Sequence, residues 1–277
     1  MRTQRIFWVS FAAFVLLLFV VPHPFISSDL GNTVLTVIAF LFGIIAGFYI
    51  VVTTTDYNSV KNILSAETAG WINLYDNVLT YDRPLAEKLS GLVDVYLRRN
   101  FDFEIIEYAE ATASEYQAIV ETVRSFPVKP ELLPVYQIIR GIMHDISIAR
   151  QQLTVLGART LSRFQWAILL ILAALFILSL YGLRTGTLFF DIVTLAISSA
   201  VVLVLLLIHY LDLYIWNERT FGFDIFENVF RAIGQLPYYP GESIADGRVR
   251  PKEKKYRVGV LMGPPGGERK IEVHTGT

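Results

Sequence analysis

The chain has 277 residues, of which 53% are hydrophobic and only 18% are charged. A typical soluble domain carries about 25% charged residues, and here the deficit is concentrated in four apolar blocks, which indicates a multi-pass membrane protein. The formal net charge of −1 provides no general attraction to nucleic acid. The chain contains no cysteine, which excludes disulfides, thiolate zinc sites and a cysteine nucleophile.

The first apolar block follows a basic start. Arg2 and Arg5 precede the apolar residues 6–21. This order also fits a signal peptide, but Pro22 and its neighbours follow where a small-x-small cleavage site would be expected. We therefore interpret residues 6–21 as a first membrane span.

The second block, residues 33–52, is long enough to cross a bilayer as a helix. Gly43 and Gly47 form a GxxxG pattern, which predicts close packing against another helix. A separate row, about 100° around the helix, holds larger apolar side chains that suit a pore constriction if several copies surround an axis. These are Phe40, Ile44 and Phe48. Facing lipid or the bundle interior is the simpler interpretation of this row.

Helical periodicity continues beyond the membrane, so we expect one helix to extend to about Leu79. Its apolar seam has spacings of four and three, as in a heptad pattern, and consists of Val60, Leu64, Trp71, Leu74 and Val78. Glu67 interrupts this seam. A buried carboxylate is costly without a donor, and Arg140, His144 and Arg150 are candidate partners. Two roles remain open: a structural pair that sets helix register, or a link that couples the domain to the span.

Residues 53–163 are predicted to form a cytoplasmic helical bundle between the second and third spans. Asp82 and Pro84 are typical of a helix start, and that helix should continue to about Arg99. A second helix is expected over residues 103–126. A third, over residues 135–156, is expected to continue directly into the third span.

The remaining spans are predicted at residues 164–181 and 188–208, within a second transmembrane pair at 164–209. Asp191 near the start of the last span is either an interfacial residue or part of an ion route. Residues 210–239 form an amphipathic segment that lies on the membrane or docks on the bundle. Residues 240–277 form a flexible cytoplasmic tail, in which residues 256–262 and 270–274 either pair as a hairpin or are disordered.

The positive-inside rule predicts the orientation in the cell membrane. Basic residues near span ends lie mostly on one side, with only Arg184 on the other. The inner set is Arg2, Arg5, Lys61, Arg159 and Arg163. We therefore expect both termini and the bundle in the cytoplasm. The whole chain is predicted to be an all-α integral membrane protein with four transmembrane helices.

Signals for enzyme chemistry are weak. The four histidines show no metal-ligand spacing, and the glycine-rich residues 263–267 lack the Lys and Ser/Thr of a phosphate loop. We expect no enzyme activity, no metal and no cofactor.

The layout resembles the bestrophin-like family of prokaryotic four-span membrane proteins, a domain of unknown function. The resemblance covers most of residues 30–235, and rests on the position of the helical insert and on Glu67 followed by Leu74-Tyr75. Asp212 followed by Phe221-Gly222 supports it, although Thr220 stands where the family commonly has proline. The more distant resemblance to bestrophin anion channels implies a homo-oligomer, pentameric in that family, with an aromatic-rich neck on the second span.

Two functions follow as hypotheses. The first is a homo-oligomeric, channel-like protein in contact with membrane lipid that passes small anions. The alternative is a membrane-anchored scaffold or signalling protein whose cytoplasmic helices bind a partner.

Overall fold

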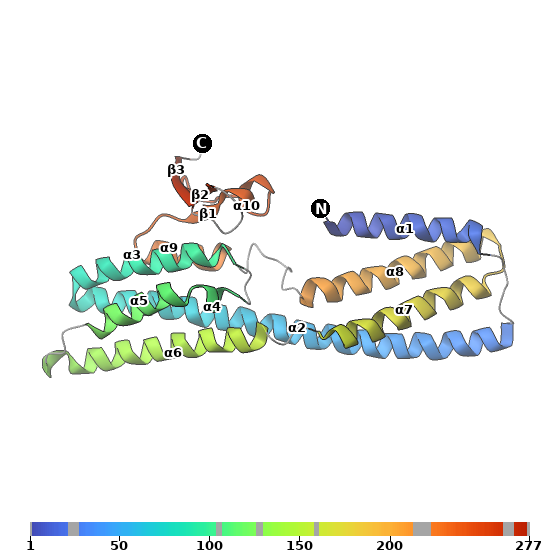
Figure 1. Ribbon diagram of the computed structural model, residues 1–277, viewed down its shortest axis with the longest axis horizontal. Coiled ribbons are helices and arrows are strands. Elements are labelled where there is room, and N and C mark those ends of the chain that lie inside the picture. Colours follow the sequence, from blue (N-terminus) through green and yellow to red (C-terminus); the bar gives the residue numbers. More distant parts are fainter. Residues whose placement is uncertain are drawn as a thin grey trace. The chain divides into compact units, whose positions relative to one another are not determined.

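The computed structural model describes residues 2–21, 28–103, 107–125, 130–157, 161–212, 223–262 and 269–275. The chain divides into two compact units. Unit 1 comprises Met1–Tyr57 and Thr160–Trp216, and unit 2 comprises Asn58–Arg159 and Asn217–Thr277. The long helix α2 (Ser28–Tyr81) contributes its first part to unit 1 and its second part to unit 2 (Figure 1).

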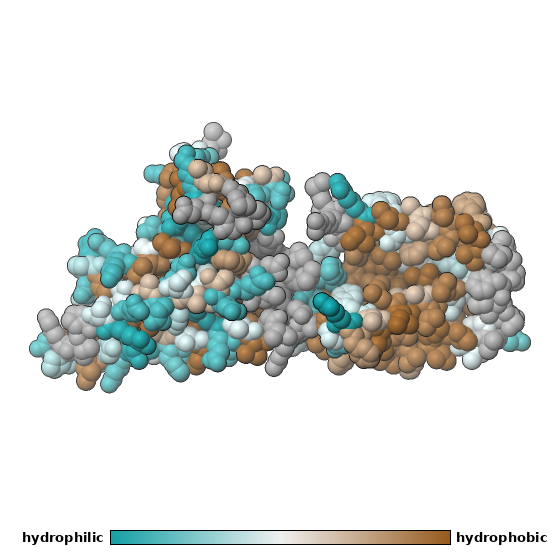
Figure 2. All heavy atoms as spheres, viewed as in Figure 1, coloured by the Kyte–Doolittle hydropathy of each residue, from teal (hydrophilic) through white to brown (hydrophobic). Residues whose placement is uncertain are grey.

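Unit 1 is a bundle of α1 (Arg2–Val20), the first part of α2, α7 (Arg163–Leu183) and α8 (Leu188–Asp212). Helix α8 packs against both α1 and α7. The core lies where α2, α7 and α8 meet, and its buried residues are Phe42, Ala46, Tyr49, Leu169, Ala173, Val201 and Ile208. The face of unit 1 seen in Figure 2 is largely hydrophobic, as expected for a surface in contact with lipid.

Three helices of the described chain are long and apolar enough to cross a membrane: α2 from Gly31 onward, α7 and α8. The apolar part of α1, Arg5–Val20, is shorter. The molecule is therefore a mostly helical membrane protein with three long apolar helices.

Unit 2 contains the second part of α2 and a set of further helices, followed by a small sheet. The helices are α3 (Arg83–Asn100), α4 (Tyr108–Ala111), α5 (Ala113–Arg124), the 3₁₀ turn η1 (Pro130–Leu132), α6 (Leu133–Gly157), α9 (Asp224–Ala232) and α10 (Gly241–Ala245). The seam predicted on α2 is confirmed, because all five of its apolar residues and Glu67 are buried. The predicted start of α3 is also confirmed: the Asp82 carboxylate accepts a hydrogen bond of 2.9 Å from the Leu85 amide, and Pro84 lies in the first turn.

The expectation of one helix over residues 103–126 is wrong. Helices α4 and α5 are separated at Thr112, which has non-helical backbone angles. In a continuous helix the Ala109 carbonyl would accept from the amide four residues later. Here it accepts a hydrogen bond from the Arg150 guanidinium, and the break lies beside this contact.

The expectation that α6 runs straight into the third span is also wrong. Ser162 has extended backbone angles, and its hydroxyl accepts a hydrogen bond from the Gln165 amide. The Gln165 side chain accepts in return from the Ser162 amide, at 2.7 Å, which completes a capping box. Since such a box satisfies the free amides of a first helical turn, it starts α7 as a separate helix.

The C-terminal part of unit 2 corrects the expectation of an all-α chain. Strands β1 (Tyr238–Pro240), β2 (Lys255–Leu261) and β3 (Arg269–Thr275) form one sheet in the order β1-β2-β3. Strands β2 and β3 pair antiparallel, so the hairpin alternative for these residues is observed, with Tyr256 opposite His274. The parallel strand β1 was not anticipated, because a three-residue run carries no detectable periodicity.

The amphipathic helix α9 docks on the bundle. Phe226, Val229 and Phe230 are buried, and the Ile233 carbonyl accepts a hydrogen bond of 2.8 Å from the Ser90 hydroxyl on α3. The segment was expected either to lie on the membrane or to dock on the bundle. The structure shows docking for residues 223–233, and residues 213–222 lie outside the described part.

Candidate functional site

The aromatic row of α2 is exposed in the single chain. Phe40, Ile44 and Phe48 are 67%, 54% and 62% exposed. The opposite face of the same helical segment, with Phe42, Ala46 and Tyr49, is buried in the core of unit 1. One apolar face of the segment therefore packs in the core of unit 1. A second apolar face is not covered by any described residue.

Gly43 and Gly47 also lie on the uncovered side. A Cβ atom built on either glycine would have no heavy atom within 4 Å, apart from its own helix backbone and chain neighbours. No described helix of the chain therefore packs closely on these glycines. The close helix packing expected from the GxxxG pattern would need a helix from outside the described part of the chain.

Glu67 lies at the centre of a buried polar cluster in unit 2. Its Oε1 atom accepts hydrogen bonds from the Trp71 indole, at 3.3 Å, and from the Tyr96 hydroxyl. The Arg150 Nη1 atom lies 4.0 Å from the same oxygen. Because all four side chains are buried, the carboxylate has the donors that its removal from water requires.

Arg150 joins this cluster to the rest of the bundle. Its guanidinium donates hydrogen bonds to the Tyr96 hydroxyl and to the Ala109 carbonyl. It also lies over the Tyr116 ring, at 4.4 Å from the centroid. A cation over an aromatic face is stabilised by the ring quadrupole, more strongly when both are buried. Glu67 and its partners thus connect α2, α3, α4, α5 and α6.

Only one of the three partners considered for Glu67 is observed. Arg140 and His144 are exposed on α6, whereas Arg150 is buried beside the seam residues of that helix. Tyr96 was missed, because nothing in the local sequence of α3 shows that its hydroxyl meets a carboxylate from α2. Burial, with the Glu67 charge as a further cause, raises the pKa of Tyr96 well above its usual value, so this hydroxyl remains a donor at neutral pH.

Two acidic residues of unit 1 have structural partners. Asp191 lies 3.4 Å from the guanidinium of Arg184, which also donates to the carbonyls of Leu18 and Val21 at the end of α1. This arrangement resembles a basic residue capping a helix C-terminus, and it supports the interfacial interpretation of Asp191.

Asp212, at the end of α8, accepts from the Leu161 amide at 2.8 Å and from the Trp166 indole at 3.0 Å. It therefore anchors the start of α7. The described residues contain no group of three or more His, Cys, Asp or Glu side chains placed to hold a metal ion.

The fold is similar to that of several solved structures. A crystal structure of a bacterial bestrophin homolog from Klebsiella pneumoniae, carrying one mutation, matches with a TM-score of 0.65 at 11% identity, covering 83% of this chain and 99% of that one. A second mutant of that homolog matches with a TM-score of 0.63 at 11% identity, covering 85% and 99%. A structure described as a membrane protein, also a mutant, gives 0.64 at 12% identity, covering 82% and 98%.

At these identities the structural matches show a shared fold and nothing more. A search of curated proteins finds no match. The model of the bestrophin-like domain matches residues 6–213, which is most of the chain. The protein therefore belongs to the bestrophin-like family.

Proposed function

We propose that this protein is the subunit of a homo-oligomeric channel that passes small anions through the cell membrane. The observation that carries the proposal is the uncovered face of α2, where Phe40, Ile44 and Phe48 are exposed while the opposite face is buried. Membership of the bestrophin-like family supports it. A pentamer is the assembly that the family resemblance favours.

In this proposal the three side chains line an apolar constriction around a central axis. Such a constriction needs no buried charge, because it controls conduction through pore width and dewetting. Gly43 and Gly47 would pack against a neighbouring copy, since a Cβ added to either has no heavy atom of another described segment within 4 Å.

The proposed topology has four spans, with α1 as the first. Both termini and the helical insert lie in the cytoplasm, as the positive-inside pattern favours. The helix α1 is the shortest of the four, and the bond from the Tyr181 hydroxyl to the Phe14 carbonyl, 2.8 Å long, ties it to α7.

Planar bilayer recordings of the purified protein test the channel. We expect an anion current that rises in Phe40→Ala and Phe48→Ala, because a smaller side chain widens the constriction. An increase of the current by about twofold corresponds to a free-energy barrier to conduction that is lower by about 0.4 kcal/mol. Leu203→Ala, at an exposed apolar position on α8, is the control and should leave the current unchanged.

Electrically silent, monomeric protein would contradict the proposal. That result would favour the alternative of a membrane-anchored scaffold whose cytoplasmic helices bind a partner. A current that responds equally to Leu203→Ala would place the constriction elsewhere.

A further inference from the structure

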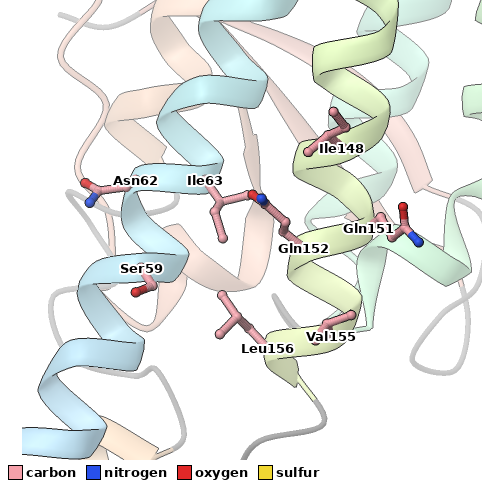
Figure 3. Close-up of a pocket in the computed structure, with 8 residues that line it drawn as sticks. All are labelled: Ser59, Asn62, Ile63, Ile148, Gln151, Gln152, Val155 and Leu156. Carbon is pink, nitrogen blue, oxygen red and sulfur yellow. The ribbon is translucent and has the colours of Figure 1, made fainter.

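A groove between α2 and α6 in unit 2 is not used by any role assigned above. It is an open groove with a volume of about 590 Å³, and it is lined by Ser59, Asn62, Ile63, Ile148, Gln151, Gln152, Val155 and Leu156 (Figure 3). In Figure 3 the side chains of Ile63 and Leu156 point into the gap between the two helices, and the Gln152 side chain extends toward Ile63. None of these residues belongs to the aromatic row or to the Glu67 cluster.

The described lining of the groove combines polar uncharged and aliphatic side chains. Among the residues that the structure describes, it consists of three amide side chains, one hydroxyl and four aliphatic side chains, and none of these is charged or aromatic. Charged residues occur nearby on both helices. Lys61 on α2 and Asp145 on α6 are exposed, and neither is among the lining residues. The volume lies within the range of about 300–1,000 Å³ that is usual for small-molecule sites.

We propose that this groove binds an uncharged amphipathic small molecule with an aliphatic body and a hydroxyl or amide head group. The aliphatic residues would cover the body of the ligand. Each amide is both donor and acceptor, as are the head groups of this class. An ion would lose hydration without meeting an opposite charge, which disfavours charged ligands. The described lining contains no aromatic residue, which disfavours ligands that bind by ring stacking.

The chain has no cysteine, so a single introduced thiol reports on the groove. The near-isosteric Ser59→Cys variant of the full chain, in lipid nanodiscs, would be labelled with a maleimide in the presence of hexyl glucoside. Hexyl sulfate is the charged probe with the same alkyl chain. Ser65→Cys, at an exposed position of the same helix outside the groove, is the matched control.

We expect hexyl glucoside to slow labelling of Ser59→Cys about tenfold at roughly ten times its Kd. Hexyl sulfate should not slow it, and Ser65→Cys should respond to neither probe. Slowing by both probes alike, or by neither, would overturn the proposal. So would a Ser59→Cys thiol that is not labelled at all, since the groove would then be covered by lipid or another copy.

A second pair of variants tests the amide itself. Adding Gln152→Leu to Ser59→Cys removes the amide from the groove and should weaken protection by hexyl glucoside. Gln137→Leu makes the same change at an exposed position of α6 outside the groove, and should leave protection intact. Unchanged protection in Gln152→Leu would count against the site. These readouts need no ion current, so they are independent of the channel proposal.

Discussion

At the residue scale, burial of the Glu67 carboxylate costs hydration free energy, and the side chains around it offset this cost. A buried carboxylate loses hydration, and Trp71, Tyr96 and Arg150 replace the lost contacts. Replacing a whole buried cluster by apolar groups can be neutral, whereas removing one partner leaves an uncompensated charge. The cluster is therefore sensitive to single substitutions.

Glu67→Gln should destabilise the protein by about 3 kcal/mol, because Arg150 then keeps its charge without a carboxylate beside it. Unfolding of the purified protein in detergent measures this loss. Glu87→Gln is the control, because Glu87 pairs with Arg83 on the surface, where an ion pair contributes at most about 1 kcal/mol.

We also propose that Glu67 couples the helical bundle of unit 2 to the membrane span, since it lies on the helix that contributes to both units. Coupling predicts that Glu67→Gln changes the anion current of the folded protein. A loss of stability with an unchanged current would leave Glu67 with a structural role only.

At the element scale, the C-terminal sheet is held by arginines that bridge it to neighbouring elements. Arg257 on β2 makes two hydrogen bonds to the Asp94 carboxylate on α3. Arg269 on β3 binds Asp102 after α3, and binds both oxygens of Glu242 on α10, at 2.6 and 2.8 Å. Paired guanidinium–carboxylate contacts are directional, so they orient the sheet as well as attach it.

This arrangement predicts an acid sensitivity. The hydrogen bonds from Arg269 hold the pKa of Glu242 below its ordinary value of 4.5. A lowered pKa in the folded state contributes stability above the unfolded pKa, and this contribution is lost as pH falls through the folded pKa. Glu242 is partly exposed, so the contribution should be at most about 1 kcal/mol.

Hydrogen exchange of the β3 amides, compared between about pH 5 and pH 3, measures the effect. Protection in the wild type should fall more than in Glu242→Gln, which lacks the titrating group. Glu131→Gln, at an exposed acid in η1, should behave as the wild type does. An equal fall in Glu242→Gln would show that this pair does not contribute.

At the scale of the whole molecule, the uncovered face of α2 is the feature that bears on assembly. Gly47→Leu should shift the protein to smaller species, because a large side chain would prevent a neighbouring helix from approaching. Within the described residues, a Cβ added at this position has no heavy atom within 4 Å apart from its own helix backbone and chain neighbours. Gly91→Leu on α3, where an added Cβ also meets no atom within 4 Å, is the matched control. Light scattering gives the mass, and an unchanged oligomer in Gly47→Leu would exclude this contact.

Much of the helical architecture could be predicted from local pattern. The α2 seam and the α3 cap are confirmed because periodicity and capping depend on residues within a few turns of each other. The breaks at Thr112 and Ser162 were not predicted. The break at Thr112 lies beside the Ala109 carbonyl, which is bound by Arg150 from 41 positions away. The break at Ser162 depends on a capping box, which is hard to recognise next to a long apolar run.

The sequence by itself determined that this is a membrane protein with a long continuous second helix and a carboxylate in an apolar seam. Hydropathy and periodicity record which faces avoid water, so they are sufficient for these conclusions. Only the tertiary structure decided that Arg150 and Tyr96 are the partners of Glu67, that a strand precedes the hairpin, and that Phe40, Ile44 and Phe48 are uncovered in the single chain. Each of these depends on contacts between segments far apart in the chain, which local pattern does not encode.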